Sequence, residues 1–220
     1  LSLTGYRSVA VPGTVLGLET LREQYGTLSR SAVMAPAIRL AEEGFVLSDG
    51  DAAILAGVSQ KLAGQENVAA IFLNSGKPWQ AGDRLVQKNL AATLRLIEKD
   101  GPDAFYKGAI ADAVVAASTA NGGILTRRDF KDYTISETAP LKCTYRGHVV
   151  ISAPPPSSGG TTVCLILGIL EAYPIGDLGF QSAQVIHLMT EAMRHAFVDR
   201  NFLLGDPDFV NNPLERLLSK

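Results

Sequence analysis

Cysteine is scarce in this 220-residue sequence, which contains only Cys143 and Cys164. Two cysteines are too few for a disulfide framework, and they match no metal-binding pattern. We therefore expect two isolated buried thiols. A single bridge between them is the alternative if the protein is exported.

Excess charge and long apolar runs are missing too. The net charge is only −2, which gives no reason to expect nucleic acid or an anionic membrane as a partner. The longest apolar run, Val163 to Leu170, is far shorter than the ~20 residues of a membrane span and indicates a buried helix. No signal-peptide pattern opens the sequence, and residues 1–12 resemble a strand or loop in progress. We expect a chain that starts within a longer protein.

Helical periodicity dominates what is present, over residues 13–133 and again over residues 160–220. Ser48 with Asp51, and Thr126 with Asp129, have the spacing of helix capping boxes. A complete α/β enzyme with this many helices should show more strands. We therefore expect a single partial domain over residues 1–220, whose sheet is largely supplied by another segment.

A strand pair is predicted at about residues 134–152, where helical spacing is lost and β-branched residues appear. Arg146-Gly147 would form its tight turn. The prolines that follow, Pro154 to Pro156, cannot lie inside a strand or helix and are expected to keep the chain extended. The fold class is therefore α+β and rich in helix.

The most suggestive segment for binding is Ser157-Ser158-Gly159-Gly160, directly before a predicted helix. Glycines at a helix N-terminus can present backbone N–H groups to an anion or an oxyanion. The segment lacks the lysine of a phosphate loop and does not match a nucleophile elbow. The alternative is a structural turn in which Ser158 or Thr161 caps the helix.

The other polar residues point to structure more than to chemistry. His187 and His195 are about 12 Å apart along one predicted helix, too far to share a metal. His148 stands alone. Asp206 and Asp208 flank a proline, which is common turn chemistry. Four charged residues at helical spacings are expected to pair across turns: Glu191, Arg194, Asp199 and Arg200. We therefore predict no metal and no cofactor.

Several segments together resemble the γ-glutamyltranspeptidase family, in the family's order. They are Val11-Pro12-Gly13-Thr14-Val15, Ala35-Pro36-Ala37, Leu40-Ala41-Glu42-Glu43-Gly44-Phe45, Gly101-Pro102-Asp103-Ala104-Phe105-Tyr106-Lys107-Gly108, Pro154-Pro155-Pro156-Ser157-Ser158-Gly159-Gly160 and Gly205-Asp206-Pro207-Asp208-Phe209-Val210. The resemblance spans nearly the whole chain and indicates an internal part of the large subunit.

This resemblance implies a precursor that cleaves itself into a large and a small subunit. The new N-terminal threonine of the small subunit attacks the γ-glutamyl amide of glutathione or a related donor. Water or an amino-acid acceptor then resolves the acyl-enzyme. The implied fold is the αββα sandwich of N-terminal nucleophile hydrolases, and the implied location is periplasmic or secreted. The partner would be the small subunit of the same precursor.

The family's catalytic positions do not map onto this chain. Thr161-Thr162 is followed by Val163, whereas the family's nucleophile lies in a T-T-H or T-S-H segment. The arginine segment that binds the donor carboxylate is absent, and the family's oxyanion serine and glycine pairs belong to the small subunit. We expect no catalytic residue here and an inactive fragment, with residues 157–160 as the remaining binding candidates. A related cephalosporin acylase subunit and a non-enzymatic helical scaffold are the alternatives.

An apolar stripe is expected to lack part of its cover in such a fragment. It comprises Val86, Leu90, Leu94 and Ile97. Contiguous exposed apolar surface favours association. The sequence therefore predicts a dimer or higher oligomer, which a monodisperse monomer in light scattering would contradict.

Overall fold

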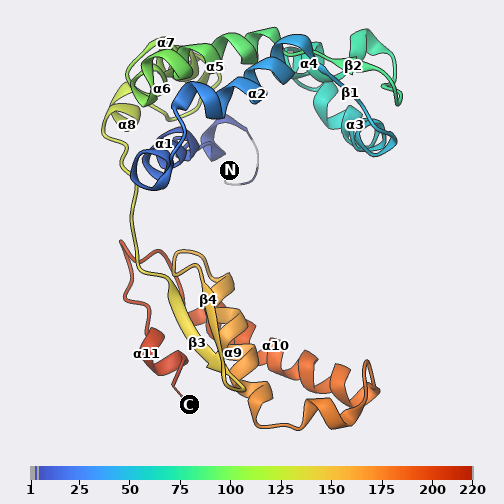
Figure 1. Cartoon of the computed structure of the whole chain (residues 1–220), viewed down its shortest axis with the longest axis vertical. Helices are drawn as coiled ribbons and strands as arrows, with labels where there is room; N and C mark the ends of the chain where they lie inside the picture. Colours follow the sequence, from blue (N-terminus) through green and yellow to red (C-terminus); the bar gives the residue numbers. More distant parts are fainter. Residues whose placement is uncertain (1–2, 4, 220) are drawn as a thin grey trace. The chain divides into compact units, whose positions relative to one another are not determined.

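The computed structural model describes residue 3 and residues 5–219, in a chain that forms two compact units, residues 1–135 and residues 136–220 (Figure 1). Helices dominate both units, and each sheet found in the described residues has two strands. A helix-rich α+β fold with few short strands is thereby confirmed.

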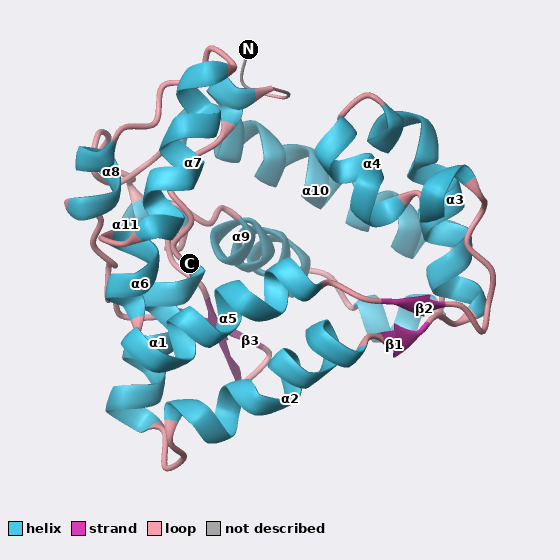
Figure 2. Ribbon diagram, turned by 90° about the horizontal axis from the view of Figure 1, so that it is seen from above, coloured by secondary structure: helices cyan, strands magenta, loops and turns pink. Residues whose placement is uncertain are grey.

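The first unit is built almost entirely of helices. They are α1 (Thr14–Tyr25), α2 (Arg30–Glu43), α3 (Asp49–Ala63), α4 (Glu66–Phe72), α5 (Lys88–Asp100), α6 (Pro102–Tyr106), α7 (Ala109–Ala120) and α8 (Arg127–Lys131), with short 3-10 turns at Tyr6–Ser8 and Asn74–Gly76. Strands β1 (Phe45–Val46) and β2 (Arg84–Leu85) pair antiparallel just beyond the end of α2 (Figure 2). Helices α2 and α5 pack against each other. Strand β1 directly follows α2 and strand β2 directly precedes α5, so the small sheet lies at one end of this helix pair.

The core of this unit lies where α6, α7 and α8 meet. Phe130 is fully buried there beside Tyr106. The Tyr106 hydroxyl donates to the carbonyl of Pro12 at 2.7 Å and accepts from the N–H of Leu16 at 3.3 Å. A buried aromatic ring with a satisfied hydroxyl ties the start of α1 to α6, which lies about 90 residues later.

An ion cluster joins α1 to the start of α2. The carboxylate of Glu19 is nearly buried, and both Arg22 and Arg30 donate to it. These hydrogen bonds, first from Arg22 and then from Arg30, lower the pKa of Glu19 from 4.5 to about 2. The cluster therefore keeps a negative charge inside the unit, balanced by two guanidinium groups.

The second unit places a β-hairpin against two helices. Its elements are β3 (Leu141–Tyr145), β4 (His148–Ser152), α9 (Gly159–Glu171), a 3-10 turn at Ile175–Leu178, α10 (Ala183–Leu203) and α11 (Leu214–Leu217). Helix α9 packs against both strands and against α10 (Figure 1). The N-terminus of α9 is therefore positioned by the hairpin and by α10 together.

The hairpin turn forms where the sequence predicted it. Tyr145 pairs with His148, and the two residues between them, Arg146 and Gly147, have φ values of 49° and 81°. Positive φ at both central residues is typical of the type I′ turn that joins twisted strands. The predicted strand pair forms, but it begins at Leu141 and not at about residue 134, so it covers only the second part of the predicted range.

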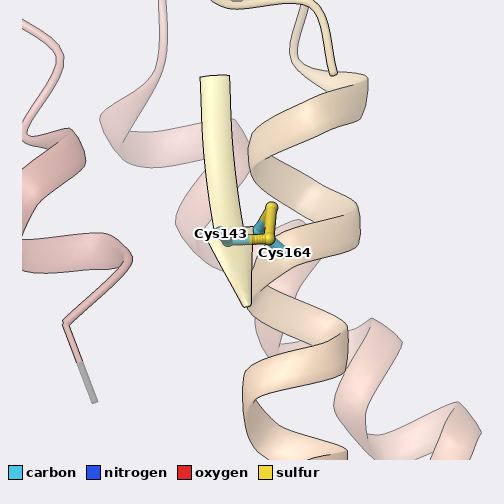
Figure 3. The surroundings of a disulfide bond; sticks show 2 residues. All are labelled: Cys143 and Cys164. Atoms are coloured by element: carbon cyan, nitrogen blue, oxygen red, sulfur yellow. A yellow bond between two sulfur atoms is a disulfide. The ribbon is translucent and has the colours of Figure 1, made fainter. Parts of the chain in front are cut away.

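The prediction of two isolated thiols is wrong. Cys143 on β3 and Cys164 on α9 form a disulfide, with their Cα atoms 6.1 Å apart (Figure 3). The two residues lie 21 positions apart in the sequence, and β3 and α9 come together only in the folded unit. The disulfide links the hairpin to the helix.

The predicted apolar stripe, which begins at Val86 and continues along α5, is only partly covered. Ile97 is buried, whereas Val86 and Leu90 remain exposed. None of the helices in the described residues combines the length and the apolar character that crossing a membrane requires. Self-association of the chain through exposed apolar surface remains a prediction.

Candidate functional site

A small cavity of about 210 Å³ lies beside the Ser-Ser-Gly-Gly segment, within the second unit. Ser157 and Ser158 line one side, together with the prolines before them, and Arg200 and Asn201 of α10 line the other. The segment therefore meets a charged side chain that follows it by about 40 residues. Sequence reasoning missed Arg200 as a member of this site.

The prolines shape the entry to this segment by turning the chain. The peptide bond between Pro155 and Pro156 is cis, and the N–H of Ser157 donates to the carbonyl of Pro154 at 3.1 Å. A cis proline at the third position of such a turn is a known turn type. The expectation of an extended chain through the three prolines is wrong, because the turn reverses it.

Ser158 occupies the position before α9 but does not cap the helix with its side chain. Its hydroxyl oxygen instead accepts a hydrogen bond from Nε of Arg200 at 2.8 Å. The same guanidinium donates through Nη1 to Asn201 at 2.8 Å and lies over the ring of Phe197, 5.7 Å from its centroid. Arg200 thus ties α10 to the N-terminus of α9.

The two glycines of the segment have different surroundings. Gly159 is exposed, and a Cβ there would touch only the Ser157 hydroxyl, at 3.9 Å. Gly160 is buried, and a Cβ there would lie 2.5 Å from the carbonyl oxygen of Ala153. Neither glycine lines the cavity. Gly160 is therefore needed for close packing against the end of β4.

The two threonines that follow are buried in the first turn of α9. The Thr162 hydroxyl donates to the carbonyl of Ser158 at 2.7 Å. The Thr161 hydroxyl is fully buried and has no hydrogen-bond partner among the described residues. A side-chain cap from Ser158 or Thr161, the structural alternative for this segment, is not formed.

We expect opposite results from valine at these two threonines. Thr162→Val removes a satisfied hydrogen bond and should lower the free energy of unfolding of the second unit by about 1 kcal/mol. Thr161→Val removes a hydroxyl that is buried without a hydrogen-bond partner, so it removes a desolvation cost. The substitution should leave the free energy of unfolding unchanged or raise it. Hydrogen exchange of α9 peptides in urea, read by mass spectrometry, measures this unit separately. Equal destabilisation by both substitutions would contradict the assignment.

The Ser158–Arg200 contact should show as coupling in a double-mutant cycle. Ser158→Ala and Arg200→Lys each remove the hydrogen bond from Nε of Arg200 to Ser158. The double variant should therefore lose about 1 kcal/mol less free energy of unfolding than the sum of the losses in the two single variants. The measurement is again the urea dependence of exchange in α9. Glu191→Gln with Arg194→Lys, an exposed ion pair on α10, is the matched control and should show less coupling. Additive effects at Ser158 and Arg200 would show that the contact contributes nothing to stability.

The cavity can hold a polar group, but it lacks the parts for nucleophilic catalysis. A guanidinium stays protonated in proteins, so Arg200 cannot accept a proton from Ser158. His187 and His195 are exposed on α10, and no hydrogen bond joins either to a serine or threonine in the described residues. A nucleophile with a base is therefore missing from the described part of this segment.

The remaining polar candidates have structural roles. Asp206 forms a turn, since its carboxylate accepts from the N–H of Asp208 at 3.0 Å. Glu191 pairs with Arg194 across one turn of α10, as predicted, while Arg200 bonds across to Ser158 instead. Within residues 3 and 5–219, no group of three or more His, Cys, Asp or Glu side chains is placed to bind a metal.

Comparisons with known proteins match the entire chain. The family model described as Gamma-glutamyltranspeptidase matches residues 1–220. A glutathione hydrolase proenzyme from Pseudomonas sp. (strain A14) is 55% identical over 220 residues, and an Acylase ACY 1 proenzyme from Pseudomonas sp. (strain SE83) is 42% identical over 219 residues. The chain spans only 38% of the first relative's length and 39% of the second's.

The fold also matches a solved structure. The crystal structure of Helicobacter pylori gamma-glutamyltranspeptidase superposes on this chain with a TM-score of 0.96 at 38% sequence identity. The match covers 100% of this chain and 63% of the crystallised chain. This chain is therefore similar to part of a longer chain.

Proposed function

Because the chain belongs to the gamma-glutamyltranspeptidase family, we propose that it is the large-subunit portion of a precursor that transfers or hydrolyses γ-glutamyl groups. Glutathione and related γ-glutamyl amides are the proposed donors, with water or an amino acid as acceptor. The observation that carries the proposal is the 55% identity over the full chain to a glutathione hydrolase proenzyme. The nucleophilic threonine would lie in the small subunit, outside this chain.

The two threonines of α9 support this placement of the nucleophile. Thr161 is 0% exposed and Thr162 is 6% exposed, so a substrate carbonyl cannot reach either hydroxyl. An attacking oxygen must come within about 3–3.5 Å of the carbonyl carbon along an open path. The Thr162 hydroxyl instead donates to the backbone carbonyl of Ser158, at the start of the same helix. We assign no catalytic residue to this chain.

The surface of the hairpin supports the proposal that another segment of the precursor supplies most of the sheet. Two apolar residues of β4 are largely exposed to solvent. The exposed fraction is 63% for Val149 and 64% for Ile151. Two strands alone are marginally stable, and a sheet gains stability from more strands and a covered face. In the proposal, the rest of the precursor completes an αββα sandwich over this face, and residues 1–220 are one partial domain of it.

The Ser-Ser-Gly-Gly segment has a supporting role in this proposal. Ser158 and Arg200 hold the start of α9, and Gly160 lets α9 approach β4. We therefore assign Ser158 and Gly160 to positioning α9, give Ser157 and Gly159 no binding role, and assign the binding of the donor to residues elsewhere in the precursor.

A periplasmic or secreted location fits the disulfide between Cys143 and Cys164. Disulfides persist in oxidising compartments and are rare in reducing ones. The proposed partner is the small subunit cut from the same precursor. The proposed reaction needs no cofactor, since a free N-terminal amine can serve as the base for its own threonine.

The test is release of p-nitroaniline from γ-glutamyl-p-nitroanilide. We expect no release by the purified chain and clear release by the full-length precursor. Precursors carrying Thr161→Ala or Thr162→Ala should still cleave themselves, because neither threonine is the proposed nucleophile. Activity in the isolated chain would overturn the proposal and place a nucleophile within these residues.

Acylase activity is the second candidate, and the 42% identity to an Acylase ACY 1 proenzyme is the observation that favours it. The two candidates differ in the acyl group that the threonine accepts. The full-length precursor should therefore also be assayed with an acylated cephalosporin. Turnover of the cephalosporin without turnover of the γ-glutamyl anilide would favour the acylase.

A further inference from the structure

The disulfide of the second unit lies in the wall of a second, larger cavity. This cavity has a volume of about 730 Å³, and both Cys143 and Cys164 line it. Gly168 of α9 and Ala172, directly after α9, also line it, and both are exposed, so the cavity opens at the surface. A structural disulfide packed in a core has no such access, because close-packed interiors leave few voids larger than a water molecule.

We propose that the Cys143–Cys164 disulfide is a thiol-exchange site that accepts small thiols from solution through this cavity. Cys143 is half-buried, whereas Cys164 is only 5% exposed. In the proposal, the incoming thiolate attacks Cys143, the more exposed of the two residues. The proposal is independent of γ-glutamyl chemistry and uses only residues of the second unit.

The exchange proceeds in two displacement steps. A thiolate attacks Sγ of Cys143, forms a mixed disulfide with it and expels Cys164 as a thiolate, which takes a proton from water. A second thiolate attacks the sulfur of the small thiol in the mixed disulfide and releases Cys143. The net reaction oxidises two small thiols to their disulfide and reduces the protein disulfide to two thiols. The link between β3 and α9 is then lost.

A single substitution can close the cavity without touching either cysteine. A Cβ added at Gly168 would meet no atom within 4 Å, and Gly168 lines the cavity. We therefore expect a larger side chain at this position to narrow the cavity. Leucine is a better helix former than glycine, so Gly168→Leu should not destabilise α9. Gly57 in α3 has equally open surroundings and lies in the first unit, which makes it the matched control.

The test follows reduction of the folded chain by 2-mercaptoethanol, with acid quenching, alkylation and peptide mass spectrometry. We expect reduction in native buffer at a rate proportional to the thiol concentration, with the mixed disulfide trapped on Cys143. Gly168→Leu should slow this reduction by about tenfold because access limits exchange, whereas Gly57→Leu should not change it.

Two results would overturn the proposal. Reduction that occurs only at urea concentrations that unfold the second unit would show a disulfide without native access. Reduction of Gly168→Leu at the unsubstituted rate would show that the cavity is not the route. The single variants Cys164→Ser and Cys143→Ser identify the entry point, since the free Cys143 should react faster with a disulfide reagent than the free Cys164.

Discussion

Gly160→Ala is expected to destabilise the second unit by about 3 kcal/mol, at the upper end of the range for overpacked sites. The new methyl carbon would lie 2.5 Å from the carbonyl oxygen of Ala153, and 2.8 and 2.9 Å from Oγ and Cβ of Ser152. Real Cβ atoms do not approach other heavy atoms this closely. Because the nearest atom belongs to the backbone, α9 must move away from β4.

The neighbouring glycine is the matched control for this expectation. Gly159→Ala adds the same methyl group one residue earlier, where the nearest atom is 3.9 Å away. Alanine is the better helix former, so this substitution should be neutral or stabilising. Hydrogen exchange of α9 and β4 peptides in urea compares the two variants. Equal behaviour would show that the close approach at Gly160 does not hold in solution.

Local patterns in the sequence predicted the local structure well. The capping boxes at Ser48 and Thr126 form as expected, each with its acidic partner three residues later. The Arg146-Gly147 turn also forms, and Gly147 readily adopts one of the two positive φ values that a type I′ turn needs. These features depend on a few adjacent residues, so a single sequence contains the information for them.

Contacts between distant elements were beyond the same reasoning. Arg200 has helical neighbours that suggested an ion pair on its own helix, yet it bonds to Ser158, 42 residues earlier. The disulfide likewise joins residues on a strand and a helix that meet only in the folded unit. Neither pairing has a periodic signal in the sequence. Predicting them requires knowing first that α9 packs between the hairpin and α10.

In the candidate site, too, the local segment could be predicted from the sequence and its distant contact could not. The sequence singled out residues 157–160 because a glycine pair precedes a helix, and Ser157 and Ser158 do line a cavity. Their chemical character, however, depends on Arg200, a residue from another element. With a guanidinium as its neighbour, Ser158 has a fixed donor beside it and no base. The segment is therefore suited to holding α9 in place.

The Glu19 cluster should give the chain a distinct dependence on pH. The hydrogen bonds from Arg22, and then those from Arg30, lower the folded pKa of Glu19 from 4.5 to about 2. A carboxyl with a lowered folded pKa stabilises the folded state above its unfolded pKa. That contribution is complete above about pH 4.5 and is lost as the pH falls towards about 2.

Glu19→Gln is expected to lower the free energy of unfolding of the first unit by about 2 kcal/mol at pH 7. This value is below the full equivalent of the pKa shift, because Arg22 and Arg30 keep 23% and 26% of their side-chain surface in contact with water. The difference from the unsubstituted chain should shrink between pH 4.5 and pH 2, since the native carboxylate is then protonated too. Urea denaturation at several pH values, followed by circular dichroism and the fluorescence of Trp79, measures both effects.

Glu23→Gln, which removes an exposed partner of Arg22, is the control and should lower the free energy of unfolding by less than about 0.5 kcal/mol. A difference between Glu19→Gln and the unsubstituted chain that stays constant from pH 7 to pH 2 would contradict the lowered pKa of Glu19.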